Sequence, residues 1–207
     1  GIDFEPNRPE NKLVNCVLRN CVLENNAGPG ILVYPKPLSQ DSDPILIRVE
    51  NCLVRGGKGA GIEVGAVLDN GPEGTIEFDN CTIERTALAG IAVYDKSADR
   101  AQVRFVNCRC KDVGLKKDRA GTGKKDSAVP LRLTLRRPQL TKRHGGIDFL
   151  NCWVYDSADR PTLVLEDKGS GLGVHDLTGN ITVCNPHGAR VDYRCNTSKI
   201  KLRVTER

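Results

Sequence analysis

Apolar and polar residues alternate in short runs along most of the chain, and the same order of runs recurs. Ile76 and Phe78 alternate with charged residues, an Asn-Cys pair follows at Asn80, and a further apolar run opens at Gly90. Alternation with a period of two places successive side chains on opposite faces of a β-strand. No stretch shows the spacing of an amphipathic helix. The pattern therefore predicts three short strands in each repeat.

The repeat is marked by the Asn-Cys pair. Five such pairs recur at the equivalent place in the repeat, and they begin at Asn20, Asn51, Asn80, Asn107 and Asn151. They are separated by 31, 29, 27 and 44 residues, which is within the range of stacked structural repeats. Because each repeat contacts its neighbours, we expect one continuous body over residues 1–207.

Three strands per repeat predict a coil in which each strand pairs in parallel with its counterpart one turn on. Connections between parallel strands are right-handed in nearly all proteins, so a right-handed coil is expected. Leucine-rich repeats are the alternative, because they have a similar period and also place Asn or Cys at a fixed position. Their Asn follows an apolar strand position by three residues. Here Asn80 follows Phe78 by two, and Leu does not dominate.

The order apolar-x-apolar-x-Asn-Cys-x-apolar, followed by a turn and Gly-Ile-x-Val, resembles the right-handed parallel β-helix superfamily. That superfamily contains pectate lyases, polygalacturonases, alginate lyases and epimerases, and phage tailspikes. The resemblance implies an all-β, single-stranded right-handed parallel β-helix of about six to seven three-strand coils, with Cys, Val and Ile stacks in its core. It also implies an Asn ladder. Asn suits the bend because it tolerates left-handed backbone conformations and can hydrogen-bond its neighbours above and below.

Composition is consistent with a thin core, since apolar residues make up 39% of the chain and aromatic residues 4%. Equivalent residues of adjacent coils lie about 4.8 Å apart with parallel side chains, whereas a disulfide brings its Cβ atoms to about 3.8 Å. We therefore expect buried free thiols at the repeated position. These are Cys21, Cys52, Cys81, Cys108 and Cys152. The odd total of nine cysteines leaves at least one unpaired or bonded to another chain.

The chain has no apolar run of the roughly 18 residues that a membrane span needs, and no signal-peptide pattern. It contains no Met, which indicates a processed chain or a piece of a longer protein. The first predicted strand, residues 1–5, starts in the middle of a coil, and an uncovered β-helix end exposes strand edges. We expect further N-terminal coils or a cap in the native protein. The compartment stays open, with a periplasmic or secreted location favoured.

The outer face of the Gly-Ile-x-Val sheet is the candidate site, because the resemblance places chemistry on the sheet that the longest loops flank. One predicted outward column runs through Asp3, Leu32, Glu63, Ala92, Arg132, Val164 and Asp192. The neighbouring column runs through Glu5, Tyr34, Gly65, Tyr94, Thr134, Glu166 and Arg194. The candidate catalytic residues are Asp3, Glu5, Glu63 and Arg132. The Cα atoms of Asp3 and Glu5 are about 6.6 Å apart on one face of a strand. This spacing allows a carboxyl separation of the order that glycosidases use.

Other residues of this face are candidates for substrate binding. Tyr34 and Tyr94 offer flat surfaces for sugar rings. Positive charge is concentrated between Leu115 and His144, where ten Lys or Arg outnumber two Asp, although the whole chain carries only +5. The candidate substrate-binding cations are Arg136, Arg137, Lys142 and Arg143. The alternative is that the outward polar residues and the basic loops are simply solvated.

Together these residues predict a polysaccharide lyase or glycoside hydrolase acting on an acidic polysaccharide, because a uronate lyase needs cations to neutralise the carboxylate and a base to take the α-proton. The alternative is a non-catalytic β-helix for glycan binding or structural support, since fold alone does not determine function. Nucleic acid is not expected, because aromatic residues do not interleave with the cations. The family motifs are incomplete, since Glu5-Pro6-Asn7 replaces the Asp-Pro-His-Asp of some epimerases and Thr141 replaces the second Arg of a pectate lyase motif.

Metal binding receives little support from the sequence. The three histidines have no metal-ligand spacing, so no metal site is assigned to them. No cofactor is assigned either, and calcium is the one cation that the outward carboxylates bring into consideration.

Overall fold

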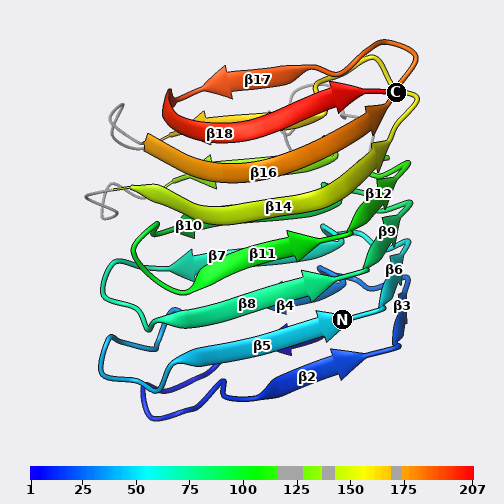
Figure 1. The fold of residues 1–207 in the computed structure, drawn as a ribbon. Helices are drawn as coiled ribbons and strands as arrows, with labels where there is room; N and C mark the ends of the chain where they lie inside the picture. The colour runs from blue at the N-terminus through cyan, green and yellow to red at the C-terminus, as the bar shows by residue number, and fades with distance from the viewer. Residues whose placement is uncertain (116–127, 137–142, 169–173) are drawn as a thin grey trace.

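The computed structural model describes residues 1–115, 128–136, 143–168 and 174–207. Within these residues the chain forms β-strands and no helix, and it winds as a right-handed solenoid of about six turns (Figure 1). Strands of successive turns pair in parallel, as in Ile62↔Ile91 and Ile76↔Val103. The predicted parallel β-helix architecture is confirmed.

One flat side of the solenoid is a seven-stranded parallel sheet, here called sheet A. Each of its strands opens with an inward apolar residue, typically the Ile of the Gly-Ile-x-Val pattern. Its strands, in spatial order, are β1 (Ile2–Phe4), β4 (Ile31–Val33), β7 (Ile62–Val67), β10 (Ile91–Lys96), β13 (Leu131–Leu135), β15 (Leu163–Asp167) and β17 (Val191–Arg194).

The other two sides are joined in one eleven-stranded sheet, here called sheet B. The strands before the Asn bend are β2 (Cys16–Arg19), β5 (Ile45–Glu50), β8 (Gly74–Asp79) and β11 (Gln102–Val106). Those after the bend are β3 (Val22–Glu24), β6 (Leu53–Arg55), β9 (Thr82–Glu84) and β12 (Arg109–Lys111). Three later strands run through the bend without a break, and they are β14 (His144–Tyr155), β16 (Val174–Cys184) and β18 (Asn196–Glu206). The three strands predicted for each repeat thus belong to two sheets, because these long strands join two sides of the coil.

The repeated Asn forms the bend as predicted. All five have a left-handed backbone, with φ between 49° and 56°, and they are Asn20, Asn51, Asn80, Asn107 and Asn151. The side-chain ladder is only partly continuous. Asn80 Nδ2 donates to Asn51 Oδ1 at 2.8 Å and Asn151 Nδ2 donates to Asn107 Oδ1 at 3.0 Å, whereas Asn107 Nδ2 donates to the Asp79 carboxylate.

The last ladder position uses a different residue for the strained conformation. Asn180 Oδ1 accepts a hydrogen bond from the Asn151 backbone N–H, so Asn180 does continue the ladder. The positive φ, however, belongs to Gly179, with φ 107°. A glycine adopts this conformation at little steric cost, so Asn180 need not.

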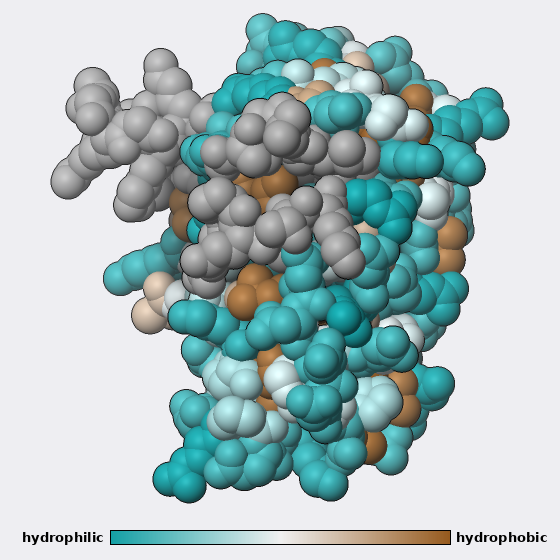
Figure 2. Space-filling view, turned by 90° about the vertical axis from the view of Figure 1, so that its left-hand side faces the viewer, coloured by the Kyte–Doolittle hydropathy of each residue, from teal (hydrophilic) through white to brown (hydrophobic). Residues whose placement is uncertain are grey.

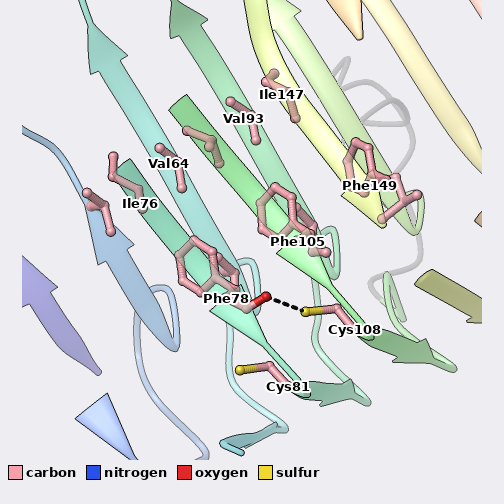
Figure 3. Close-up of a cluster of buried hydrophobic side chains, with 14 of the residues drawn as sticks. Val64, Ile76, Phe78, Cys81, Val93, Phe105, Cys108, Ile147 and Phe149 are labelled. Carbon is pink, nitrogen blue, oxygen red and sulfur yellow. Dashed lines mark hydrogen bonds between the residues drawn. The ribbon is translucent and has the colours of Figure 1, made fainter. Parts of the chain in front are cut away.

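The core between the sheets consists of columns of identical or similar apolar side chains. Figure 3 shows one part of it, where Phe78, Phe105 and Phe149 follow one another with ring centroids 5.1 Å apart. Cys81 and Cys108 lie beside this stack, and the Cys108 thiol donates to the Phe78 carbonyl oxygen at 3.3 Å. Stacking at the rung distance explains why one residue type recurs at each core position.

All nine cysteines are free thiols. Cys52, Cys81, Cys108 and Cys152 are buried as predicted, whereas Cys21, in the first complete turn, is only partly buried. The buried thiols Cys81 and Cys152 donate to backbone carbonyl oxygens of the preceding turn, at 3.5 and 3.3 Å. These contacts satisfy the sulfur in a core that holds few other polar partners.

Apolar side chains of the first and last turns are less buried than those between them, and Leu18 and Leu202 are examples. The expectation of further N-terminal coils or a cap stays a prediction. Among the described segments, none is a helix with the length and apolar character to cross a membrane.

Candidate functional site

The outer face of sheet A carries both columns of residues that the repeat pattern predicts. The strand register aligns Asp3 with Leu32, Leu32 with Glu63, Glu63 with Ala92 and Ala92 with Arg132. The neighbouring column aligns Gly65, Tyr94, Thr134, Glu166 and Arg194. Strand alternation therefore does bring the candidate residues to one face of the solenoid.

Tyr34 and Tyr94 form an aromatic pair on this face. Their ring centroids are 6.3 Å apart and their planes are tilted by 41°. Residues two rungs apart would stand about 9.6 Å from each other if their side chains were parallel. The rings are closer because Gly65 lies between them and Tyr94 leans over it, so that a Cβ added to Gly65 would overlap the Tyr94 ring.

Polar groups hold the Tyr94 ring in place. Burial, together with the nearby Glu63 carboxylate, raises the pKa of Tyr94 well above its usual value, so the phenol stays neutral. On the ring face, the Arg136 guanidinium carbon lies 4.3 Å from the ring centroid, in cation–π geometry. The Arg136 backbone N–H is fixed in turn by Asp95, at 2.7 Å.

Arg132 shares the column of Glu63 but does not lie on an open surface. Its Nη2 pairs with Glu166 Oε2 at 3.2 Å, and the two side chains are only 12% and 11% exposed. Outward residues beside them, Thr134 and Val164, are each 1% exposed. The face is therefore open between β1 and β10 and covered at β13 and β15. Glu166 also lies near Lys168, at 3.4 Å.

Asp3 and Glu5 lie at the exposed edge strand of the face. Neither makes an ion pair in the part of the chain that the structure describes. Asp3 is two rungs from Glu63, so the two carboxylates are not adjacent. Asp3 and Glu5 are thus solvated acids. Glu5 follows Phe4, whose carbonyl oxygen accepts a hydrogen bond from the Tyr34 backbone N–H at 3.0 Å.

The remaining candidate cations divide into two groups. Arg143 pairs with Asp99 at 2.6 Å and with Asp176 at 3.3 Å, so two carboxylates occupy its guanidinium. These partners place it at the edge where the chain passes from sheet A to sheet B, not beside Tyr94. Arg137 and Lys142 lie outside the described residues.

That same edge contains a buried lysine that the sequence pattern did not single out. Lys96 is fully buried, and its Nζ donates to the backbone oxygens of Ser97 and of Gly145, the latter at 2.9 Å. Burial lowers the pKa of Lys96 to about 7, and nearby carboxylates oppose this shift. The register aligns Lys96 with Val67, so alignment of the repeats is the signal that reveals a charge at a core position.

Around Lys96 the edge is polar. Ser97 Oγ donates to Asp69 Oδ1 at 2.6 Å. Figure 2 views this edge and shows a described surface that is mainly hydrophilic, with small separate hydrophobic spots. The buried amine is therefore part of a corner held by hydrogen bonds, and it does not reach the sheet A face.

No group of three or more His, Cys, Asp or Glu side chains within the described ranges could hold a metal ion. The carboxylates of the sheet A face do not gather into a calcium site in these ranges, and we derive no step through a metal.

No protein-family model, no curated protein and no solved structure matches this chain. The class that the fold defines is the parallel β-solenoid.

Proposed function

We propose that the open part of the sheet A face binds an acidic polysaccharide, and that the protein is a member of the pectate lyase-like superfamily. The observation that carries the proposal is the Tyr34–Tyr94 pair with Arg136 over the Tyr94 ring. Aromatic rings present a large apolar surface at little conformational cost, which suits the C–H faces of sugar rings. A guanidinium beside them can form charge-assisted hydrogen bonds with a uronate carboxylate.

Two features indicate that this surface is built to stay in one conformation. Gly65 makes room for the leaning Tyr94 ring, and the Arg136 guanidinium lies over the face of that ring. A binding surface that is ordered before the ligand arrives loses less entropy on binding.

Cleavage of the bound polysaccharide is the second candidate function, and the Glu63–Tyr94 pair favours it. A carboxylate and a neutral phenol close to each other and to a cation offer both a proton acceptor and a proton donor to a bound uronate. Arg132 does not suit the role of base, because it is nearly buried and paired with Glu166. In this proposal, Glu63 is the proton acceptor and Tyr94 is the proton donor. Asp3 and Glu5 add negative charge at the edge of the face.

Calorimetric titration with a panel of uronate polymers, and with a neutral polymer, tests the binding. We expect saturable binding of a uronate polymer, weakened about tenfold in Arg136→Ala, which corresponds to one charge-assisted hydrogen bond. Tyr94→Ala should weaken binding more than Tyr94→Phe. The matched control is Arg48→Ala, an exposed arginine on the outer face of sheet B.

Absence of binding by the unaltered protein, or an equal loss in Arg48→Ala and Arg136→Ala, contradicts the proposal. The same samples are assayed for unsaturated products and for new reducing ends. Cleavage that is lost in Glu63→Gln while binding remains would assign the enzymatic role. Binding without cleavage would assign the non-catalytic one.

A further inference from the structure

A second aromatic pair lies on a different side of the solenoid, on β14 after the Asn151 bend. The rings of Trp153 and Tyr155 are nearly parallel, with an interplanar angle of 11° and centroids 6.0 Å apart. Cys152 precedes Trp153, and Val154 lies between the two aromatic residues. Both point into the core, where they are 4% and 1% exposed. The two rings therefore stand side by side on the outer surface, where Tyr155 is 36% exposed.

Positive charge surrounds this pair. The register with β12 aligns Arg109 with Trp153 and Lys111 with Tyr155. Both cations are exposed, and neither makes a hydrogen bond or ion pair through its side chain with the residues that the structure describes. The Arg207 guanidinium carbon lies 5.5 Å from the centroid of the Trp153 ring.

The nearby acids are Glu84, Asp112, Asp156 and Glu206. Glu84 is aligned with Lys111 and pairs with Arg85 at 3.5 Å, and Asp112 follows Lys111 in the chain. Asp156 is 5% exposed and is bound by Arg160, at 2.8 Å. Glu206 accepts a hydrogen bond from the backbone N–H of Ala189, at 2.8 Å. Arg109 is aligned with Thr82 and Trp153 and with no acid, so its positive charge favours an anionic ligand at the ring pair.

A hollow of about 250 Å³ borders Lys111 at the end of β12. It is lined by Glu84, Arg85, Lys111 and Asp112. Arg85 has a left-handed backbone, with φ 53°, at a turn position that Asn25 and Asp112 fill in other coils with similar φ. Asn and Asp tolerate this conformation and a bulky residue does so less readily, so the arginine is held there against its backbone preference.

We infer that Trp153 and Tyr155, together with Arg109 and Lys111, form a second saccharide-binding site that takes a carboxylated or sulfated sugar. The ring pair receives the apolar face of the sugar, and the two cations bind its anionic group. The site lies on sheet B, on strands separate from those of the sheet A face (Figure 1). The inference therefore does not depend on the function proposed for sheet A.

A sugar fits this surface better than a single-stranded nucleic acid does. Nucleic-acid strands are bound by successive aromatic platforms that stack several bases. Here the residues aligned with Trp153 on the neighbouring strands are Arg109 and Thr182, and neither is aromatic. One ring pair with adjacent cations matches a single anionic sugar unit.

Trp153 is the only tryptophan of the chain, so tryptophan emission reports on this site alone. We expect a saturable change in tryptophan emission on titration with a uronate or sulfated oligosaccharide, and none with a neutral oligosaccharide. Arg109→Ala and Lys111→Ala should each weaken the apparent affinity about five- to tenfold. Tyr155→Ala should weaken it further, and Tyr155→Phe should retain it.

A control separates this site from the sheet A face. Tyr94→Ala should leave the fluorescence titration unchanged even if it abolishes the calorimetric signal of the other site. The inference is wrong if acidic oligosaccharides leave the emission of the folded protein unchanged, or if Lys111→Ala binds as tightly as the unaltered protein. A single-stranded oligonucleotide that saturates the signal at lower concentration would also overturn it.

Discussion

Neighbouring residues of one strand contribute unequally to stability, because they face opposite sides of the sheet. Phe105 is fully buried and stacks between Phe78 and Phe149. Arg104, the residue before it, points outward and pairs with Glu77 at 2.8 Å, with 40% of its side chain exposed. Removal of a buried ring leaves a cavity, whereas an exposed ion pair adds little because solvent screens it.

Phe105→Ala should therefore lower the free energy of unfolding by about 3–5 kcal/mol. Arg104→Ala, the matched control, should lower it by less than about 1 kcal/mol. Urea denaturation followed by circular dichroism measures both. Similar losses in the two variants would contradict a core carried by the phenylalanine stack.

The candidate site was only partly predictable at the residue scale. Asp3, Glu63 and Arg132 share a column because the two-residue period and the repeat fix which side of the sheet each faces. The sequence did not reveal that Arg132 is nearly buried against Glu166, because that pairing depends on side-chain conformation and on what covers the strand. The sequence also did not reveal that Tyr94 leans over Gly65, because this contact joins residues of successive turns.

At the scale of the element, strand β10 ends in a corner that buries a charge. Lys96 takes the place that Val67 has in β7, and its amine donates to two backbone oxygens. Three carboxylates, Asp99, Asp148 and Asp176, favour its protonated form, but burial outweighs them and lowers the pKa of Lys96 to about 7. The corner is therefore least stable at pH values at which the Lys96 amine is protonated.

The sign of the resulting pH dependence follows from proton binding. Below about pH 7 the amine is protonated in both the folded and the unfolded chain, so its contribution does not change with pH. Between about 7 and its ordinary pKa of 10.5, the unfolded chain holds the proton and the folded protein does not. Stability should therefore rise with pH in this window, by at most about 1.4 kcal/mol per pH unit.

Lys96→Met should remove this rise, because it keeps a similar stem and has no titrating amine. Urea midpoints of the variant and the unaltered protein, compared at pH 7, 8 and 9, give the difference in slope. Lys58→Met, at an exposed lysine, should leave the slope unchanged. Equal slopes in Lys96→Met and the unaltered protein would rule out a neutral amine at the corner.

Strand lengths were less predictable than strand positions. The Asn-Cys pair predicted a break at every bend, and β5 and β6 are indeed separated at Asn51. At Asn151 the backbone takes the same left-handed conformation, yet β14 continues from His144 to Tyr155. The difference lies in pairing with the next turn, since β16 follows β14 through the bend with a shift in register. The sequence of one repeat therefore does not determine where the strands of the next repeat begin and end.

For the whole molecule, the repeat predicts that stability is spread over contacts between successive turns. Each turn contacts the turns before and after it, so the free energy of folding is approximately a sum of turn and interface contributions. The solenoid should therefore tolerate loss of one complete turn better than a smaller loss that breaks the phase of the coil. The pairs β3–β6–β9 and β2–β5–β8–β11 keep one register throughout, so any two of these turns have matching surfaces.

Deletion of residues 52–80 tests this, because it joins Asn51 directly to Cys81 and removes one complete turn. Strand β9 would then pair with β3, and β11 with β5. We expect a folded protein with a β-rich circular dichroism spectrum, a cooperative transition and a lower urea midpoint. Deletion of residues 52–66, about half a turn, brings outward residues to inward positions and should yield an unfolded or aggregated chain. If the shorter deletion were the better tolerated of the two, stability could not depend on turn-by-turn stacking in register.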